Sequence, residues 1–172
     1  MPLATYQQVR PWAKAIRDEV LARRMPPWDA VQGVGEFRDD ASLSAPEMDM
    51  VVRWVEGGAP EGDVVLTAPK TAAPSNFAAY TQAPAGLSVS GDSTLPHALR
   101  LTGIWTPGPC EVTALLPGGA VQRLLWVRNF HARRNQIYWL REPCLLPRGT
   151  HLFVRAASAV SVRLLTTAAP AS

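Results

Sequence analysis

The sequence predicts a multidomain fold, in which a short all-α segment is followed by an antiparallel β-sandwich or jelly roll. Two stretches before residue 60 carry apolar residues at three- and four-residue spacing, which indicates amphipathic helices. A stretch rich in Pro and Ala comes next. From about residue 85 the chain consists of short alternating runs at roughly ten-residue spacing, which is typical of sandwiches and jelly rolls.

The first helix is expected over residues 5–24. Thr5 followed by Gln8 fits a capping box at its start. Pro11 interrupts the pattern, so either the helix begins there or a short turn precedes it. The helix ends at Pro26-Pro27, since proline disfavours helical geometry in the residue before it. The apolar stripe consists of Val9, Trp12, Ala13, Ile16 and Val20.

The second helix has the clearest local signals of the chain. Ser44-Ala45-Pro46-Glu47 combines a capping box with proline in the first turn. Gly57-Gly58 provides a C-cap, and Pro60 prevents the helix from resuming. Residues 29–43, between the two helices, read as a polar connection with glycine turns.

The chain divides at its Pro/Ala-rich stretch. We predict a helical segment over 1–63, a linker over 64–84 in extended form, and an antiparallel β-sandwich over 85–168. The expected strands are 87–89, 99–101, 111–116, 121–127, 136–140, 151–156 and 160–165.

Composition excludes several classes of function. The formal net charge is +3, without a lysine-rich run, which argues against a nucleic-acid partner. No apolar run approaches the ~18 residues of a membrane span, and the first residues lack the pattern of a signal peptide. Cys110 and Cys144 could form a disulfide or lie buried as small hydrophobic residues.

Candidate chemistry in the β region is sparse. The three histidines, His97, His131 and His151, show no paired spacing of the kind that metal sites use. Arg128 and the pair Arg133-Arg134 form either a small anion-binding patch or a solvated loop.

The helical part resembles the back part of a bacterial c-type cytochrome domain. The similarity covers residues 3–63 and rests on Arg10-Pro11-Trp12-Ala13-Lys14, Met25-Pro26-Pro27-Trp28 and Trp54-Val55-Glu56-Gly57-Gly58-Ala59-Pro60. The resemblance implies that Met25 is an axial haem ligand, with Trp12, Ile16 and Trp28 in the haem-pocket wall. The Cys-x-x-Cys-His attachment motif does not occur in this sequence. Two explanations are open: a chain truncated at its N-terminus, which we favour, or a degenerate relative without haem. We expect haem c if the native chain extends upstream, and otherwise no cofactor.

The β region is similar to the second jelly-roll domain of copper type II, ascorbate-dependent monooxygenases, over roughly residues 98–157. The similarity rests on residues 112–119, 138–143 and 146–150. The positions that match the family's metal ligands hold Thr102, Ile104 and Ala157, none of which binds copper. We therefore expect no copper site.

The resemblance implies a c-type cytochrome-like electron-transfer protein of the periplasm or cell envelope, with an unidentified redox partner protein and no substrate turnover. One alternative is a non-catalytic β-sandwich interaction module, for which residues 85–165 would fold and bind alone. A second is a divergent copper-dependent monooxygenase-like protein that has lost its copper ligands.

Overall fold

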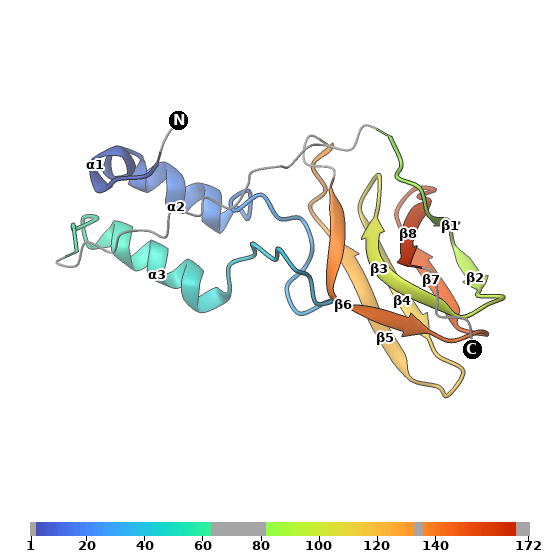
Figure 1. The fold of residues 1–172 in the computed structure, drawn as a ribbon. Coiled ribbons are helices and arrows are strands. Elements are labelled where there is room, and N and C mark those ends of the chain that lie inside the picture. The colour runs from blue at the N-terminus through green and yellow to red at the C-terminus, as the bar shows by residue number, and fades with distance from the viewer. Residues whose placement is uncertain (1–2, 63–81, 133–135, 168–172) are drawn as a thin grey trace. The chain divides into compact units, whose positions relative to one another are not determined.

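The computed structural model describes residues 3–62, 82–132 and 136–167 and contains two compact units (Figure 1). The described residues of the helical unit are 3–28 and 41–62. The sandwich unit comprises residues 29–40 together with the β region. Most of the predicted linker, 64–81, lies outside the described residues.

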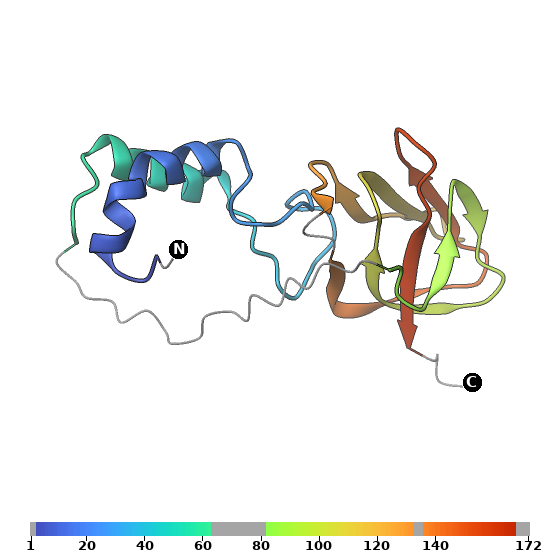
Figure 2. The same cartoon turned by 90° about the horizontal axis from the view of Figure 1, so that it is seen from above.

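The helical unit consists of α1 (Tyr6–Val9), a 3-10 turn (Arg10–Trp12), α2 (Ala13–Leu21) and α3 (Ala45–Glu56). The predicted single helix over 5–24 is therefore interrupted, because Pro11 lacks the donor that a continuous helix needs. The helices α2 and α3 lie side by side and run in opposite directions (Figures 1 and 2).

The start of α3 agrees with its sequence signals. The Ser44 side chain accepts from the Glu47 backbone, and the Glu47 carboxylate accepts from the Ser44 backbone at 2.8 Å. At the other end the Tyr6 hydroxyl donates to the Ala59 carbonyl at 2.8 Å. The Trp54 indole donates to the Pro60 carbonyl, four residues beyond the helix, at 3.0 Å. Side-chain bonds thus define both ends of α3.

The antiparallel β-sandwich predicted from the sequence is confirmed. Its strands are β1 (Leu87–Val89), β2 (Asp92–Thr94), β3 (Leu99–Trp105), β4 (Cys110–Leu115), β5 (Val121–Val127), β6 (Ile137–Leu146), β7 (His151–Arg155) and β8 (Val162–Thr167). They form two four-stranded sheets, ordered β1-β8-β3-β6 and β2-β7-β4-β5 (Figure 1). This is the strand order of a jelly roll, in which two Greek keys are wound together.

The sandwich core lies between the two sheets. Alternation along the strands puts apolar side chains on the inner faces, as in β4, where Cys110, Val112 and Ala114 are buried. The fully buried residues of this core include Leu101, Ile104, Val112, Leu125, Leu146, Leu152, Val162 and Leu164.

Residues 29–40 form a strap along one side of the sandwich. The strands β5 and β6 are end strands of their respective sheets. Ala30 bridges to Val127 of β5, and Phe37 bridges to Leu140 of β6. The strap therefore covers both edges with backbone hydrogen bonds, one of the ways in which proteins protect edge strands.

The strap also contributes apolar side chains, since Val34 and Phe37 are buried. Its path requires glycine at position 35, where φ is +73°. An added Cβ there would lie 2.5 Å from the Leu124 carbonyl oxygen.

The strap changes the boundary drawn from the sequence. From their sequence, residues 29–43 are expected to belong to the helical segment as a polar connection, whereas their contacts group 29–40 with the sandwich. Residues 29–40 belong to the sandwich because they pair with β5 and β6, and no local sequence pattern in 29–40 predicts this pairing. Among the described residues, no helix has the length and apolar character needed to cross a membrane.

Candidate functional site

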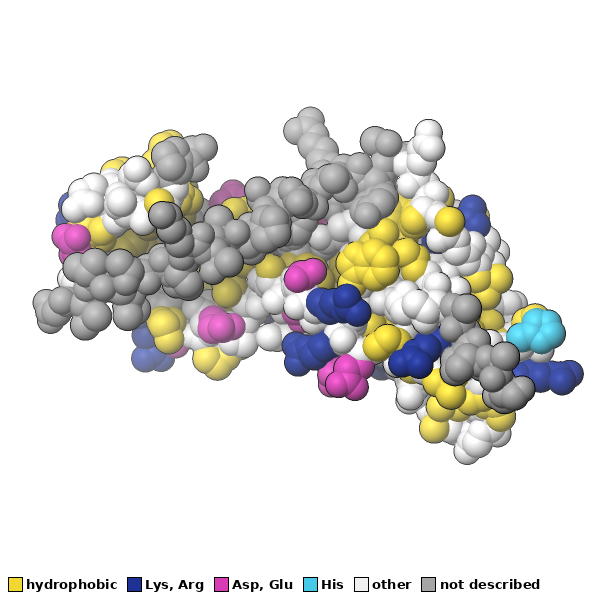
Figure 3. Space-filling view, in the orientation of Figure 1, with side chains coloured by type: hydrophobic (Ala, Val, Ile, Leu, Met, Phe, Trp, Pro, Cys, Tyr) yellow, Lys and Arg dark blue, Asp and Glu magenta, His cyan; other side chains and the backbone are white. Residues whose placement is uncertain are grey.

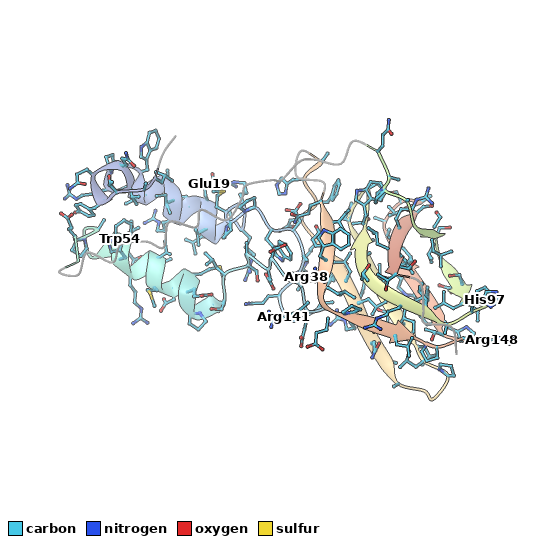
Figure 4. The ribbon with its side chains drawn as sticks, viewed as in Figure 1. Glu19, Arg38, Trp54, His97, Arg141 and Arg148 are labelled. Atoms are coloured by element: carbon cyan, nitrogen blue, oxygen red, sulfur yellow. The ribbon has the colours of Figure 1, made fainter. Side chains whose placement is uncertain are left out.

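Met25 stands at a defined point just after α2. The Glu19 carboxylate accepts two hydrogen bonds from the Arg24 guanidinium, at 2.8 and 2.9 Å. The Glu19 carbonyl accepts from the backbone of Arg24 at 2.9 Å and of Met25 at 3.3 Å. Figure 4 places Glu19 near the end of α2. Glu19 thus holds the turn that presents Met25, whose side chain is 47% exposed.

The three predicted wall residues differ in exposure. Trp12 immediately precedes α2 and is 47% exposed, although the sequence pattern put it on the packed stripe. Ile16 lies one helical turn further along the same side and is half-buried. Trp28 is buried, with 8% of its surface exposed. Met25 and Trp12 therefore offer free surface, and Trp28 offers little.

The helical unit buries few of its apolar side chains. Its buried cluster consists of Ala13, Val55 and Ala59, with Trp54 packed against it. Figure 3 shows hydrophobic side chains at the surface of these helices. Among the described residues of this unit, the exposed large apolar side chains are Leu3, Trp12, Leu21, Met25 and Met50.

A groove of about 780 Å³ lies elsewhere on the helical unit. It is bounded by Tyr6, Arg10, Lys14 and Val55, among others, and Met25 does not line it. Met25 is therefore not part of this groove.

Histidines and cysteines lie only in the sandwich unit. His151 pairs through Nδ1 with the Thr94 hydroxyl at 2.9 Å, and His97 is exposed. Cys110 and Cys144 are free thiols, the first buried and the second partly buried. Burial raises the pKa of both thiols, more than the Thr106 hydroxyl lowers that of Cys110. These thiols are consequently protonated at neutral pH.

His131 and Asp29 tie the strap to the chain beyond β5. The Asp29 carboxylate is buried and accepts from the His131 backbone at 2.9 Å. Its other oxygen lies 3.0 Å from His131 Nδ1. Burial, and secondarily the Asp29 charge, raise the pKa of the nearby Tyr138 phenol well above its usual range. The pair joins chain positions 102 residues apart and acts as a structural tether.

Two of the positions at which the resemblance led us to look for copper ligands, Thr102 and Ile104, have structural roles. The Thr102 hydroxyl donates to the Leu165 carbonyl at 3.0 Å, and Ile104 is fully buried. Within the described parts of the chain, no group of three or more His, Cys, Asp or Glu side chains could hold a metal ion.

A second candidate site lies on the sheet β2-β7-β4-β5. Trp126 carries guanidinium groups of Arg123 and Arg128, each 5.2 Å from the ring centroid. Arg128 and Arg155 both line an adjoining groove of about 380 Å³. Sequence reasoning singled out Arg128 but missed Trp126 and Arg155. Only the strand register brings these residues together. Arg133-Arg134, the other part of the predicted patch, lies outside the described residues.

Comparison of the chain with models of known protein families, with curated proteins and with solved structures gives no match.

Proposed function

We propose that the helical unit is part of a c-type cytochrome-like electron-transfer protein of the periplasm or cell envelope, with Met25 as an axial haem ligand. The observation that carries the proposal is the exposed thioether of Met25, on a turn after α2 that Glu19 and Arg24 hold. A thioether is a soft donor of the kind that ligates cytochrome haem. Its usual place, by contrast, is a packed core.

The proposal assigns roles to described residues at both ends of α2. Met25, after the helix, would be the ligand, and Trp12 and Ile16, before and within the helix, would supply apolar wall. Trp28 is packed and would support the turn rather than face the cofactor. The histidine ligand and the two attachment thiols would have to come from a segment upstream of this sequence. Bound haem c would supply one-electron redox chemistry; Met25 would orient it, and the apolar wall would limit access of water.

A haemochrome spectrum of the protein isolated from its own cells is the first test of this proposal. A c-type haem signal is expected, together with a mass above that of this sequence. A colourless protein with the mass of this sequence would overturn the electron-transfer proposal.

A variant test isolates the role of Met25. The chain is mixed with a haem c peptide that carries its own histidine ligand, and the charge-transfer band of methionine-ligated ferric haem is recorded. Met25→Ala should abolish this band. The matched control is Met50→Ala, since Met50 is also exposed and lies in the same unit. Equal bands in the two variants would contradict the assignment.

A second candidate function is a non-catalytic β-sandwich interaction module. The observation in its favour is the exposed cluster of arginines around Trp126 on one sheet. Tryptophan and arginine are the residues most enriched in binding hot spots. The two functions are compatible, since they use different units.

A further inference from the structure

The groove on the sheet β2-β7-β4-β5 has a basic and aromatic lining. It lies at the end of β4, β5 and β7, and Cys110, Glu111, Trp126, Arg128, Arg155 and Ala157 are among the residues that line it. Its volume is about 380 Å³, enough for one or two side chains of a partner.

The strand register explains why these side chains meet. Glu111 of β4 pairs with Trp126 of β5 on one side and with Arg155 of β7 on the other. Directly opposed residues on adjacent strands point to the same face of the sheet. Since Cys110 and Val112 point into the core, this row of three lies on the outer face.

The charges in the groove do not cancel. Glu111 Oε1 accepts two hydrogen bonds from the Arg123 guanidinium, at 3.0 and 3.1 Å, so the acidic member is already neutralised. The Arg128 guanidinium contacts the Trp126 ring. Arg155 is exposed, and its side chain has no ion pair or hydrogen bond with any described residue. Two arginines therefore present uncompensated donors next to an aromatic ring.

This arrangement matches the chemistry of a carboxylate followed by an apolar group. Guanidinium groups bind carboxylates through paired N–H donors. The Trp126 ring offers a partly exposed flat surface beside them. A nucleic acid would need a longer series of phosphate contacts than two free arginines provide.

The edge of β5 restricts how a partner can bind. The Val31 amide donates to the Trp126 carbonyl at 2.7 Å, and Ala30 bridges to Val127. The strap therefore occupies the backbone groups that a peptide would use to add a strand to this edge. Recognition in the groove must come from side chains.

We propose that this groove binds an acidic segment of a partner protein, with an Asp or Glu carboxylate held by Arg128 and Arg155 and a neighbouring apolar side chain on Trp126. The proposal is independent of electron transfer through Met25. It names a class of ligand for the proposed interaction module. It depends only on residues of the sandwich unit, so its failure would leave the electron-transfer proposal untouched.

The test is an NMR titration of the ¹⁵N-labelled full chain with the peptide acetyl-Glu-Glu-Phe-Glu-Glu-amide at low salt. The Trp126 indole and the Arg155 backbone amide should shift on binding. Arg128→Gln and Arg155→Gln should each weaken binding by about two- to fivefold, the effect expected for an exposed charge pair.

Arg148→Gln is the matched control. Arg148 is also exposed, but it lies in the turn before β7, at the end of that strand opposite to Arg155 (Figure 4). The control removes the same charge and should leave binding unchanged. Three results would overturn the proposal: no shift at Trp126, an equal loss of affinity in the Arg148 variant, or tighter binding of a single-stranded oligonucleotide at the same residues.

Discussion

Replacing Phe37 by alanine tests whether the strap is an integral part of the sandwich. Phe37 is 2% exposed and lies against Tyr138 of β6, with ring centroids 5.7 Å apart and planes inclined by 59°. The substitution leaves the backbone bonds of the strap in place and removes only the buried ring. Any loss of stability then reports the packing of this side chain.

The expected loss follows from burial and from the cavity that remains. Burying a phenylalanine side chain is worth about 1.5–3 kcal/mol, and an aromatic pair adds about 0.5–1.5 kcal/mol. Incomplete collapse of the cavity brings the usual cost to about 3–5 kcal/mol. For a domain with about 5–15 kcal/mol in total, this is a large fraction.

Amide hydrogen exchange of the full chain is the suitable assay. A chain with two compact units need not unfold in one step, so a single melting midpoint would mix their stabilities. Exchange instead reports residue by residue. The free energies of exchange should fall for the Val31 and Arg38 amides, which donate to β5 and β6, and for amides in those two strands.

Leu145→Ala is the control, since Leu145 lies on the same strand β6 and is 61% exposed. It should change stability by no more than about 0.5 kcal/mol. A loss below about 1 kcal/mol for Phe37→Ala, comparable to that of the control, would refute an integral role for the strap.

Three further outcomes are expected. Gly35→Ala should lower the free energies of amide exchange in β5 and β6 more than Gly33→Ala does. Both positions have positive φ, but only at Gly35 would the new Cβ meet a backbone oxygen, and equal losses would count against this reasoning. Because burial raises the pKa of Tyr138, the stability that this residue contributes should be complete below the unfolded pKa of about 10 and should decline as pH rises beyond it. The midpoint of urea unfolding should therefore fall less steeply with alkaline pH in Tyr138→Phe than in the unmodified protein. An unchanged pH dependence would contradict the raised pKa of Tyr138. Ser44→Ala should cost about 1 kcal/mol of stability in α3. Hydrogen bonds from the Ser44 side chain and backbone lower the pKa of the Glu47 carboxyl, so the stabilisation by the Glu47 carboxylate is lost as pH falls through this lowered pKa. In the variant, an NMR titration should show the pKa of Glu47 closer to its ordinary value.

Elements with local signals could be predicted from the sequence. The helix from Ala45 to Glu56 follows from its capping box and its glycines, and the strand Val121–Val127 follows from the turn that precedes it. The two sheets of the sandwich follow from the spacing of the strands. In each case the determining residues lie within a few positions of the element.

Features that depend on distant pairing could not be predicted. The strap contains no alternating run, and its partners on β6 lie about 100 residues away, as the bond from Arg38 to the Leu140 carbonyl shows. The Trp126 cluster depends on a register that places Arg155 beside Glu111. Trp12 was placed on a packed stripe from its spacing, yet the short 3-10 turn before α2 leaves it half exposed.

The strap has a consequence for the order in which the protein is synthesised. Asp29 emerges from the ribosome 102 residues before His131, its partner in the tether. Until β5 and β6 have been made, Phe37 and Val34 have no strands to pack against. Contacts of such long sequence separation form late and slowly. During translation the apolar side chains of the strap thus remain exposed until its sheets form, and a pause after the strap leaves a nascent chain on which chaperones can act.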